Sequence, residues 1–190
     1  MDATFSPDGQ QVATGSLDQT ARLWDGLDGK PLAAFSGHTG AVLSVVFNSN
    51  GTRLVTASVD STLRLWDVRK GELIGVLRGH GEFIHPECPP VFTPDGTRLV
   101  SGAKDGTVRI WDISLVERNG ILNGHESYVY DVAFNPNGEQ VASAAWDGTV
   151  RLWDPTTGLQ TGKLPHETGI LTSVAYSRDG HRLATAERYR

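Results

Sequence analysis

The chain has 190 residues, of which 38% are hydrophobic and 21% charged, and its formal net charge is −5. This composition is typical of a folded globular protein and excludes a disordered chain. The excess of 22 acidic over 17 basic residues argues against nucleic acid or a membrane as the partner, because both attract a positive surface. The single Cys88 excludes an intrachain disulfide, and no apolar run approaches the ~20 residues of a membrane span, so we expect a cytoplasmic protein.

A unit of about 42 residues repeats along the chain. Trp-Asp pairs recur at 24–25, 66–67, 111–112 and 153–154, with spacings of 42, 45 and 42 residues. Gly-His pairs recur at 37–38, 79–80 and 124–125, and Pro165-His166 stands where a fourth is expected. A turn that ends in Asp or Asn and then Gly recurs as SPDG (6–9), NSNG (48–51), TPDG (93–96), NPNG (135–138) and SRDG (177–180). Because three independent markers share one period, we interpret the chain as a repeat protein.

Each repeat predicts four β-strands. The first, such as VLSVVF (42–47), leads through a turn to the second, such as RLVTAS (53–58). Pro favours the second position of such a turn, and Gly supplies the positive φ. A further turn leads to the Trp-bearing strand, such as TLRLWD (62–67), and a looser fourth strand precedes the next Gly-His pair. Four antiparallel strands per repeat are typical of a β-propeller blade, so we expect an all-β fold.

The repeats predict one propeller domain with a partial ring over residues 1–190. We expect blades at 1–36, 37–78, 79–123 and 124–164 and a half blade at 165–190. The chain begins within the innermost strand of its first blade, and its fifth repeat stops before a third strand. Since propellers close with about four to eight blades, we expect a second copy joined head to tail, or another chain, to complete the ring. The alternative is a piece of a longer propeller.

Four residue types recur at fixed offsets within the repeats. The sets are His38, Thr56, Asp60 and Trp66; His80, Ser101, Asp105 and Trp111; and His125, Ser143, Asp147 and Trp153. The first repeat has Thr14, Asp18 and Trp24 without a preceding His, and the fifth would use His166 and Thr185, with Tyr189 at the Asp position. His, Asp and Ser are also catalytic residue types. A copy in every repeat favours instead a buried relay of hydrogen bonds in which each polar group has a partner.

The combination of Gly-His, the PDG turn and S/T-x3-D-G-T-V-R-L-W-D resembles the WD-repeat (Trp-Asp repeat) β-propeller family over nearly the whole chain. The regular SPDG and DGTVRLWD phrases are similar to those of bacterial members. The resemblance implies that each recurrent set is a structural tetrad, which ties the outer loop of a blade to its inner strands. It also implies a scaffold that binds proteins or peptides rather than an enzyme. The alternative in the same class is the sensor or ligand-binding part of a bacterial multidomain signalling protein.

The resemblance places two kinds of position on the top rim of the propeller. The residue before the tetrad Asp is Leu17, Val59, Lys104 or Trp146 in the first four repeats, and the positions three and five residues after His125 hold Tyr128 and Tyr130. The repeat itself does not require Trp146, because Trp153 already supplies its tryptophan. Exposed Trp and Tyr are enriched in interface hot spots, so these six residues are our candidate partner-binding site. The alternative is that the aromatic residues fill the channel or a gap between blades.

The third repeat carries three extra residues between His80 and Phe92. Prolines in this segment cannot donate sheet hydrogen bonds, which predicts an interrupted innermost strand. The residues outside the repeat pattern here are Glu82, His85, Glu87 and Cys88. They leave a metal site, or a hydrolase or lyase site in the channel, as alternatives. One Cys and one His make a weak ligand set, and we expect no catalytic residue, no metal and no cofactor.

Overall fold

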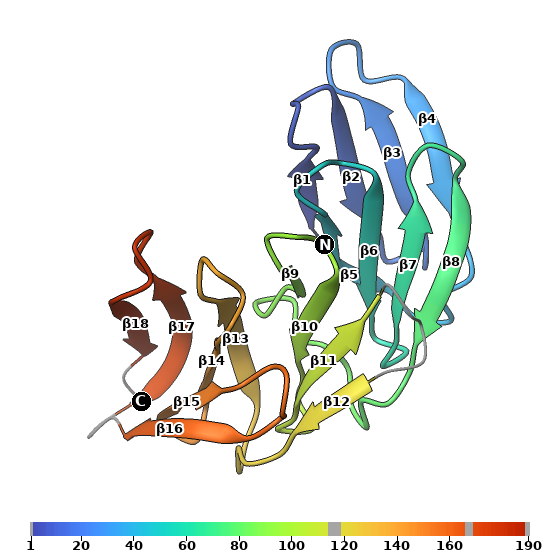
Figure 1. Cartoon of the computed structure of the whole chain (residues 1–190). Helices are drawn as coiled ribbons and strands as arrows, with labels where there is room; N and C mark the ends of the chain where they lie inside the picture. The colour runs from blue at the N-terminus through green and yellow to red at the C-terminus, as the bar shows by residue number, and fades with distance from the viewer. Residues whose placement is uncertain (1, 114–118, 166–168, 189–190) are drawn as a thin grey trace. The chain divides into compact units, whose positions relative to one another are not determined.

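The structure is a computed structural model that describes residues 2–113, 119–165 and 169–188. Within those residues all regular elements are β-strands, β1 to β18 (Figure 1). In the described part of the chain, no helix is long and apolar enough to span a membrane. The chain divides into two compact units, Met1–Pro86 and Glu87–Arg190, which we call the N-terminal and the C-terminal unit.

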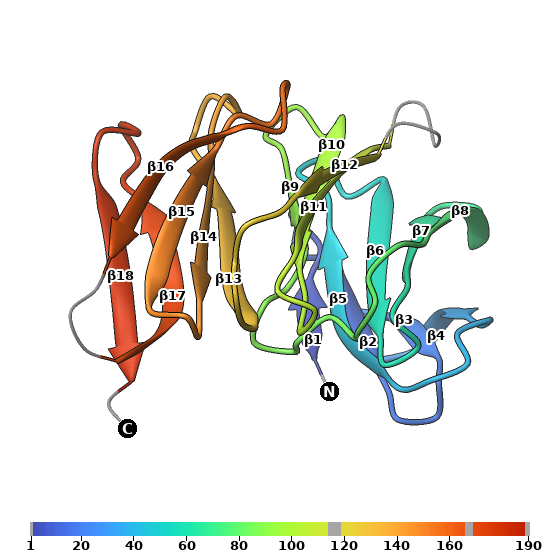
Figure 2. The same ribbon diagram turned by 90° about the horizontal axis from the view of Figure 1, so that it is seen from below.

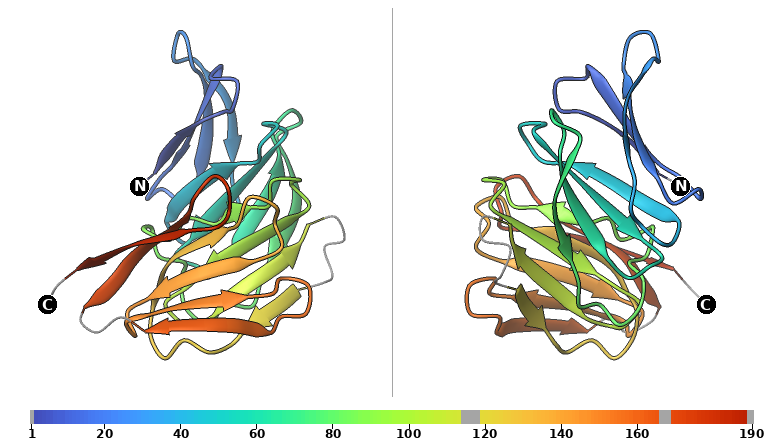
Figure 3. Two further views of the ribbon diagram at one scale, coloured as in Figure 1. Left: turned by 60° about the vertical axis from the view of Figure 1, so that its left-hand side comes forward. Right: turned by 90° about the vertical axis from the view of Figure 1, so that its right-hand side faces the viewer.

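The N-terminal unit contains two four-stranded antiparallel sheets, each in simple chain order. Blade 1 consists of β1 (Ala3–Phe5), β2 (Gln11–Gly15), β3 (Ala21–Asp25) and β4 (Pro31–Phe35). Blade 2 consists of β5 (Val42–Phe47), β6 (Arg53–Ser58), β7 (Leu63–Asp67) and β8 (Glu72–Leu77). Figure 3 shows the two sheets of this unit in blue and teal. Side chains from both sheets, among them Leu23, Phe35, Val45 and Phe47, form one buried cluster between them.

The C-terminal unit contains two further four-stranded sheets and one two-stranded sheet. Blade 3 consists of β9 (Val91–Phe92), β10 (Arg98–Gly102), β11 (Val108–Asp112) and β12 (Asn119–Leu122). Blade 4 consists of β13 (Val129–Phe134), β14 (Val141–Ala145), β15 (Thr149–Trp153) and β16 (Gln160–Pro165), and half-blade 5 of β17 (Ile170–Tyr176) and β18 (Leu183–Arg188). Figure 2 shows β13 and β14 beside β17 and β18.

These antiparallel four-stranded sheets confirm the predicted all-β fold with four-stranded blades. The PDG-type turns form as predicted, since Gly51 has φ +69° and Gly96 has φ +68°, a backbone conformation that favours glycine. The interrupted innermost strand of the third repeat is also confirmed, because β9 is two residues long where β13 has six. The predicted extent of a single propeller domain stays a prediction.

Blade 4 has a neighbour on both faces, which explains why the residues of β14 are small and, apart from the tetrad residue Ser143, apolar. Val141 and Ala145 belong to the buried cluster shared with blade 3. Ala142 and Ala144 point the other way, into the cluster shared with half-blade 5. All five residues of β14 are buried, so this strand shows no alternation of polar and apolar side chains.

Candidate functional site

The tetrad of blade 2 is a continuous chain of hydrogen bonds. Nδ1 of His38 lies 2.8 Å from Oδ2 of Asp60, and its Nε2 lies 2.7 Å from Oγ1 of Thr56. The indole N–H of Trp66 donates to the same hydroxyl over 3.0 Å. The tautomer that satisfies every group has the Nδ1–H of His38 donating to Asp60 and the hydroxyl of Thr56 donating to Nε2.

Blade 4 repeats this arrangement with Ser in place of Thr. His125 lies 2.9 Å from Asp147 through Nδ1 and 2.7 Å from Ser143 through Nε2. Trp153 donates to Ser143 over 2.8 Å. Two copies of the same geometry, on different sheets, fit a role in the architecture of each blade.

Blades 1 and 3 show the hydrogen bond from the tryptophan to the hydroxyl that is one part of this tetrad. Trp24 donates to Thr14, and Trp111 donates to Ser101, each over 2.9 Å. In blade 1, which has no His, the carboxylate of Asp18 instead accepts from Thr20 and Arg22. In blade 3, Asp105 accepts from the backbone and the hydroxyl of Thr107, and His80 is a buried residue of the N-terminal unit. The positions predicted for the fifth repeat include His166 and Tyr189, which lie outside the described residues.

Burial and hydrogen bonding fix the protonation of the blade 2 tetrad. Burial is the main cause that lowers the pKa of His38, which favours the neutral ring. Burial alone would raise the pKa of Asp60, but hydrogen bonds from Thr62, Thr39 and His38 outweigh it and bring the pKa to about 2. The pKa of Asp147 in blade 4 is lowered by the same balance of burial against hydrogen bonds. Both carboxylates are therefore ionised at neutral pH.

This order of hydroxyl, imidazole and carboxylate is chemically that of a catalytic triad. The hydroxyls decide against that chemistry, because Thr56 and Ser143 are both 0% exposed. Each of them also accepts a hydrogen bond from the indole N–H of a tryptophan. A nucleophile must reach its substrate, and these cannot.

The candidate rim residues of the C-terminal unit lie together. The ring of Trp146 contacts Tyr128 edge-on, with centroids 5.7 Å apart and an interplanar angle of 88°. It also contacts Tyr130, at 5.7 Å and 36°. The ammonium of Lys104 lies 4.9 Å from the centroid of Tyr128, within cation–π range. We call Tyr128, Tyr130 and Trp146 the aromatic cluster; Tyr128 is exposed, and the other two are half-buried.

Strand geometry explains how these side chains meet. The backbone N–H of Trp146 donates to the carbonyl of Tyr128 over 2.8 Å, which ties the end of blade 4's second strand to the start of its first. Tyr130 occupies a β-bulge, because Val129 pairs with Ala145 while Asp131 pairs with Ala144. A bulge re-aims the side chain of its extra residue. Here Tyr130 reaches the indole of Trp146.

The remaining two candidates, Leu17 and Val59, lie in the N-terminal unit. Both are exposed, at 66% and 45%. Val59 directly follows β6, as Trp146 directly follows β14, and Leu17 lies two residues after the end of β2. Their role in binding a partner stays a prediction.

Comparison with known proteins identifies the repeats. A family model described as WD domain, G-beta repeat, matches residues 1–25, 29–67, 71–112 and 117–154. The chain belongs to this WD-repeat family. The resemblance inferred from the sequence is thereby confirmed, and the four four-stranded sheets described above are WD-repeat blades.

Curated relatives match short parts of the chain. The Notchless protein homolog of Arabidopsis thaliana is 47% identical over 36 residues, which is 19% of this chain and 8% of that protein. Nuclear distribution protein PAC1 of Mycosarcoma maydis is 46% identical over 46 residues, 24% of this chain and 10% of that protein. WD repeat-containing protein 86 of Homo sapiens is 51% identical over 39 residues, 20% of this chain and 10% of that protein. The matches therefore span a tenth or less of each relative.

Two kinds of contact in these WD repeats were missed by the sequence reasoning. The first explains the glycine of two of the Gly-His pairs, Gly37-His38 and Gly124-His125. A Cβ on Gly37 would lie 2.6 Å from Nη1 of Arg64, whose Nη2 donates to the carbonyl of Gly37 over 2.7 Å. A Cβ on Gly124 would meet Arg151 at the same distance. The arginine of the RLWD strand recurs with the same period as Gly-His, and that joint recurrence was the available signal.

The second contact is a carboxylate that joins neighbouring blades. Oδ2 of Asp131 in β13 accepts from the hydroxyl of Ser173 over 2.8 Å and from the N–H of Val174 over 2.9 Å, both in β17. Asp2 makes the same two bonds to Ser44 and Val45 over 3.1 Å each. We call this arrangement the inter-blade clamp. The sequence signal was an Asp followed 42 residues later by a Ser, once in each unit.

The insertion of the third WD repeat holds a buried thiol. Cys88 is 0% exposed, and burial is the main cause that raises the pKa of its thiol, with the nearby Asp131 adding to the effect. A thiol with a raised pKa is a poor nucleophile and a poor metal ligand. Among the described residues, no three His, Cys, Asp or Glu side chains are arranged to hold a metal ion. His85 stacks on Phe83, with ring centroids 6.5 Å apart.

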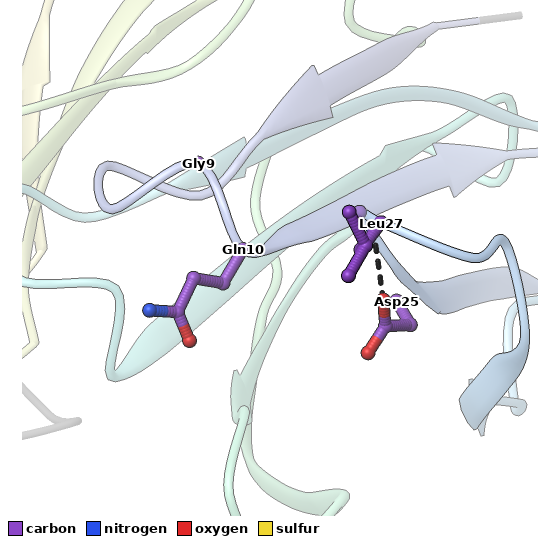
Figure 4. A pocket seen from close by; sticks show the side chains of 5 residues that line it. Gly9, Gln10, Asp25 and Leu27 are labelled. Carbon is purple, nitrogen blue, oxygen red and sulfur yellow. Dashed lines mark hydrogen bonds between the residues drawn. The ribbon is translucent and has the colours of Figure 1, made fainter.

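A cavity of about 380 Å³ lies at one end of blade 1, lined by Gly9, Gln10, Asp25, Gly26 and Leu27 (Figure 4). Gly26 occupies the position that holds the buried Val68 in blade 2, so a side chain is missing there. The polar groups of the loop bond to one another: Gly26 donates to the carbonyl of Gln10, and Asp25 accepts from Leu27.

Proposed function

We propose that this chain is a non-enzymatic scaffold that binds a protein or peptide partner on the rim of its WD-repeat blades. The observation that carries the proposal is the aromatic cluster. The repeat pattern does not require a tryptophan at position 146, yet the rings of two tyrosines contact Trp146. Partly exposed Trp and Tyr side chains supply much apolar contact area at a low entropic cost, which is why they dominate interface hot spots.

Membership of the WD-repeat family supports the proposal, because the family resemblance implies binding of proteins or peptides. The candidate contacts in the C-terminal unit are Trp146, Tyr128, Tyr130 and Lys104. In the N-terminal unit they are the exposed Leu17 and Val59. With its acidic net charge, the chain is proposed to bind neither nucleic acid nor a membrane.

The burial of the potentially reactive side chains supports a role without catalysis. The tetrad hydroxyls are buried and hydrogen-bonded, and the thiol of Cys88 is buried with a raised pKa. A channel hydrolase or lyase would need one accessible set of such groups. Nothing in the described residues favours that alternative over the scaffold.

Selection from a random peptide library displayed on phage tests the proposed function. We expect peptides to be enriched on the unaltered chain and to lose about tenfold or more in affinity when Trp146→Ala is introduced, since truncating an aromatic hot spot removes its packing. The matched control is Leu159→Ala, which removes an equally apolar side chain, 66% exposed, from another part of the same unit. Thermal unfolding of both variants is measured in parallel.

Two results would count against the scaffold. The first is a library that yields no peptide dependent on Trp146. The second is a Trp146→Ala chain that unfolds well below the temperature of the control, because the indole would then be part of the packing rather than of a binding surface.

A further inference from the structure

Trp146 differs from the other four tryptophans of the chain in its hydrogen bonding. The indole N–H groups of those four, one in each of blades 1 to 4, donate to the hydroxyl of a Thr or Ser. Within residues 2–113, 119–165 and 169–188, no group accepts a hydrogen bond from the indole N–H of Trp146. Its side chain is half-buried against the rings of Tyr128 and Tyr130. The aromatic cluster therefore has a hydrogen-bond donor available to a partner.

The rings of the aromatic cluster present faces in different directions. Relative to the indole of Trp146, the plane of Tyr128 is turned by 88° and that of Tyr130 by 36°. Aromatic side chains supply a large, rigid contact area, so they lose little conformational freedom when they pack against a partner. The contact is most favourable when the partner group is itself apolar and rigid.

Charged side chains of both signs accompany the aromatic cluster. Burial raises the pKa of the Tyr130 hydroxyl, Glu87 raises it further and Arg188 lowers it, while the ammonium of Lys104 lies over the ring of Tyr128. Other charged residues stand next to these in the sequence or contact Asp147, namely Asp105, Glu126, Asp147, Arg151 and Glu187. A charged segment of either sign would therefore meet like charges, which disfavours binding. A neutral segment does not.

The free indole N–H also selects the backbone conformation of the segment. In an α-helix or a paired strand the carbonyl groups already accept hydrogen bonds from their own fold. A polyproline II segment has no internal hydrogen bonds, so its carbonyls remain available as acceptors. Proline favours this conformation, and its pyrrolidine ring is neutral, apolar and rigid. A proline-rich segment thus meets the requirements of the rings, the charges and the donor together.

We propose that the aromatic cluster binds a neutral, proline-rich segment of a partner protein in the polyproline II conformation. Pyrrolidine rings of the segment pack against the aromatic side chains, and the indole N–H of Trp146 donates to one of its main-chain carbonyls. This inference rests on the proposed scaffold function and adds the chemistry of the partner.

Fluorescence anisotropy with labelled peptides tests the inference. One peptide is proline-rich without charged residues, and a second has Ala in place of every Pro. We expect the proline-rich peptide to bind at least about tenfold more tightly, because the Ala peptide lacks both the rings and the preformed conformation. Its affinity should not fall when salt is raised from about 0.15 M to about 1 M, since no ion pair contributes.

Variants of the protein separate the donor from the ring. Trp146→Phe keeps an aromatic ring but removes the N–H, and it should weaken binding about three- to tenfold without lowering the thermal stability. Trp66→Phe is the comparison for stability, because the indole N–H it removes donates to Thr56 and its loss should lower the unfolding temperature. For binding, the matched controls are Leu159→Ala, Glu126→Gln and Arg188→Gln, which should each change the affinity less than about twofold.

Three outcomes would overturn the inference and leave the scaffold standing. In the first, the Ala peptide binds as tightly as the proline-rich one, and Trp146→Ala weakens both. In the second, Trp146→Phe binds the proline-rich peptide as tightly as the unaltered chain does. In the third, an Ala peptide flanked by Lys or by Glu binds more tightly than the neutral proline-rich peptide.

The library selection distinguishes this inference from the function on which it rests. Peptides that depend on Trp146 should be enriched in proline, and selected peptides without proline would show that only the inference is wrong. If no labelled peptide binds and the selection also yields none, both proposals are wrong.

Discussion

The His–Asp pair of blade 2 contributes to the way in which the stability of this protein depends on pH. Asp60 has a pKa of about 2 in the folded chain against an ordinary value of 3.8, so its contribution is complete above about pH 4 and is lost as the pH falls toward 2. The pKa of His38 is lowered from 6.5, and folding therefore favours the neutral ring. That contribution is complete above pH 6.5 and declines below it. Both groups therefore lower the free energy of unfolding as the pH falls.

We expect the free energy of unfolding to decrease steadily as the pH is lowered from about 6.5 to about 2. Urea unfolding at a series of pH values measures it. Asp60→Asn should be less stable at neutral pH and should lose part of the slope below about pH 4, since Asp147 of blade 4, whose pKa is also lowered, keeps its own contribution. The exposed-site control Glu139→Gln should keep the whole slope. A stability that rises on acidification would contradict the assignment of the tetrad as an ionised Asp beside a neutral His.

Two turns carry residues in a backbone conformation that favours glycine. Gln19 has φ 72° and Ser61 has φ 64°, where blades 3 and 4 have Gly106 and Gly148 at φ 74° and 72°. The left-handed conformation costs a residue with a Cβ about 1–2 kcal/mol, while glycine adds about 0.5–1 kcal/mol of unfolded-state entropy. We expect Ser61→Gly to stabilise the chain by about 0.5–1 kcal/mol in chemical denaturation, as the difference between these two effects.

The converse substitution supplies the control. A Cβ on Gly106 would lie 3.0 Å from the carbonyl oxygen of Ser127 and 3.1 Å from that of His125, in addition to the strained φ. Gly106→Ala should therefore destabilise by more than about 1 kcal/mol. Equal and opposite effects at the two sites would mean that backbone strain alone, without the close contacts, sets the energy of this turn.

Among single residues, those fixed by the repeat were the easiest to predict. The partners of His38 and His125 follow from residue types that recur at constant offsets, because a buried polar group needs a partner in every copy. The contact of Arg64 with Gly37 was missed, since a sequence does not show that a side chain passes over a backbone Cα. The predicted proximity of Trp146 to Tyr128 and Tyr130 is seen in the structure, and their role in binding stays a prediction.

At the scale of strands, the inter-blade clamp fastens half-blade 5 to blade 4. Asp131 is half-buried, and its removal would leave both the hydroxyl of Ser173 and the N–H of Val174 without this acceptor. We expect Asp131→Ala to destabilise by about 2–3 kcal/mol and Ser173→Ala by about 1 kcal/mol. The destabilisation of the double variant should be smaller than the sum of the two single effects by at least about 0.5 kcal/mol, because the two groups share one interaction.

Additive effects in this double-mutant cycle would show that the clamp contributes little beyond packing. The clamp of the N-terminal unit, Asp2 with Ser44, offers an independent repetition of the same cycle. Its bonds are 3.1 Å long, against 2.8 and 2.9 Å in the C-terminal unit. We therefore expect the same sign and a smaller coupling there.

Strands and turns followed from local chemistry, and so their order was predictable. The two-residue β9 follows from prolines that cannot donate, and the turn glycines follow from their positive φ. The β-bulge at Tyr130 was not predicted, because a register shift depends on the pairing of two strands rather than on either sequence alone. The clamp was missed for a similar reason, since it joins residues of different sheets.

At the scale of the molecule, the face of blade 1 that carries Phe5 bears on the predicted assembly of several copies. Phe5 is 64% exposed, whereas Phe47, at the same position in blade 2, is 9% exposed and packs in the cluster shared with blade 1. An exposed aromatic side chain on a sheet face is a surface available for contact with another blade. The homo-oligomer predicted from the sequence stays a prediction, and so does the number of blades in its ring.

Light scattering coupled to size exclusion measures the mass in solution. We expect a mass of more than one copy, and we expect Phe5→Asp to shift it toward a single copy, because a charge on this face would have to be desolvated in a contact. Leu27→Asp, at a 97% exposed loop residue of the same unit, is the matched control. A compact monomer of the unaltered chain would contradict the predicted homo-oligomer.

The sole cysteine gives this protein a built-in reporter of its own motions. Cys88 is packed with Val100, Val129 and Val132 in the core of the C-terminal unit, so a thiol reagent can reach it only when that core opens. The rate of modification under native conditions would thus measure the free energy of opening for this one region, without an introduced label. Comparison with the free energy of complete unfolding would reveal whether blades 3 and 4 open alone or only with the rest of the chain.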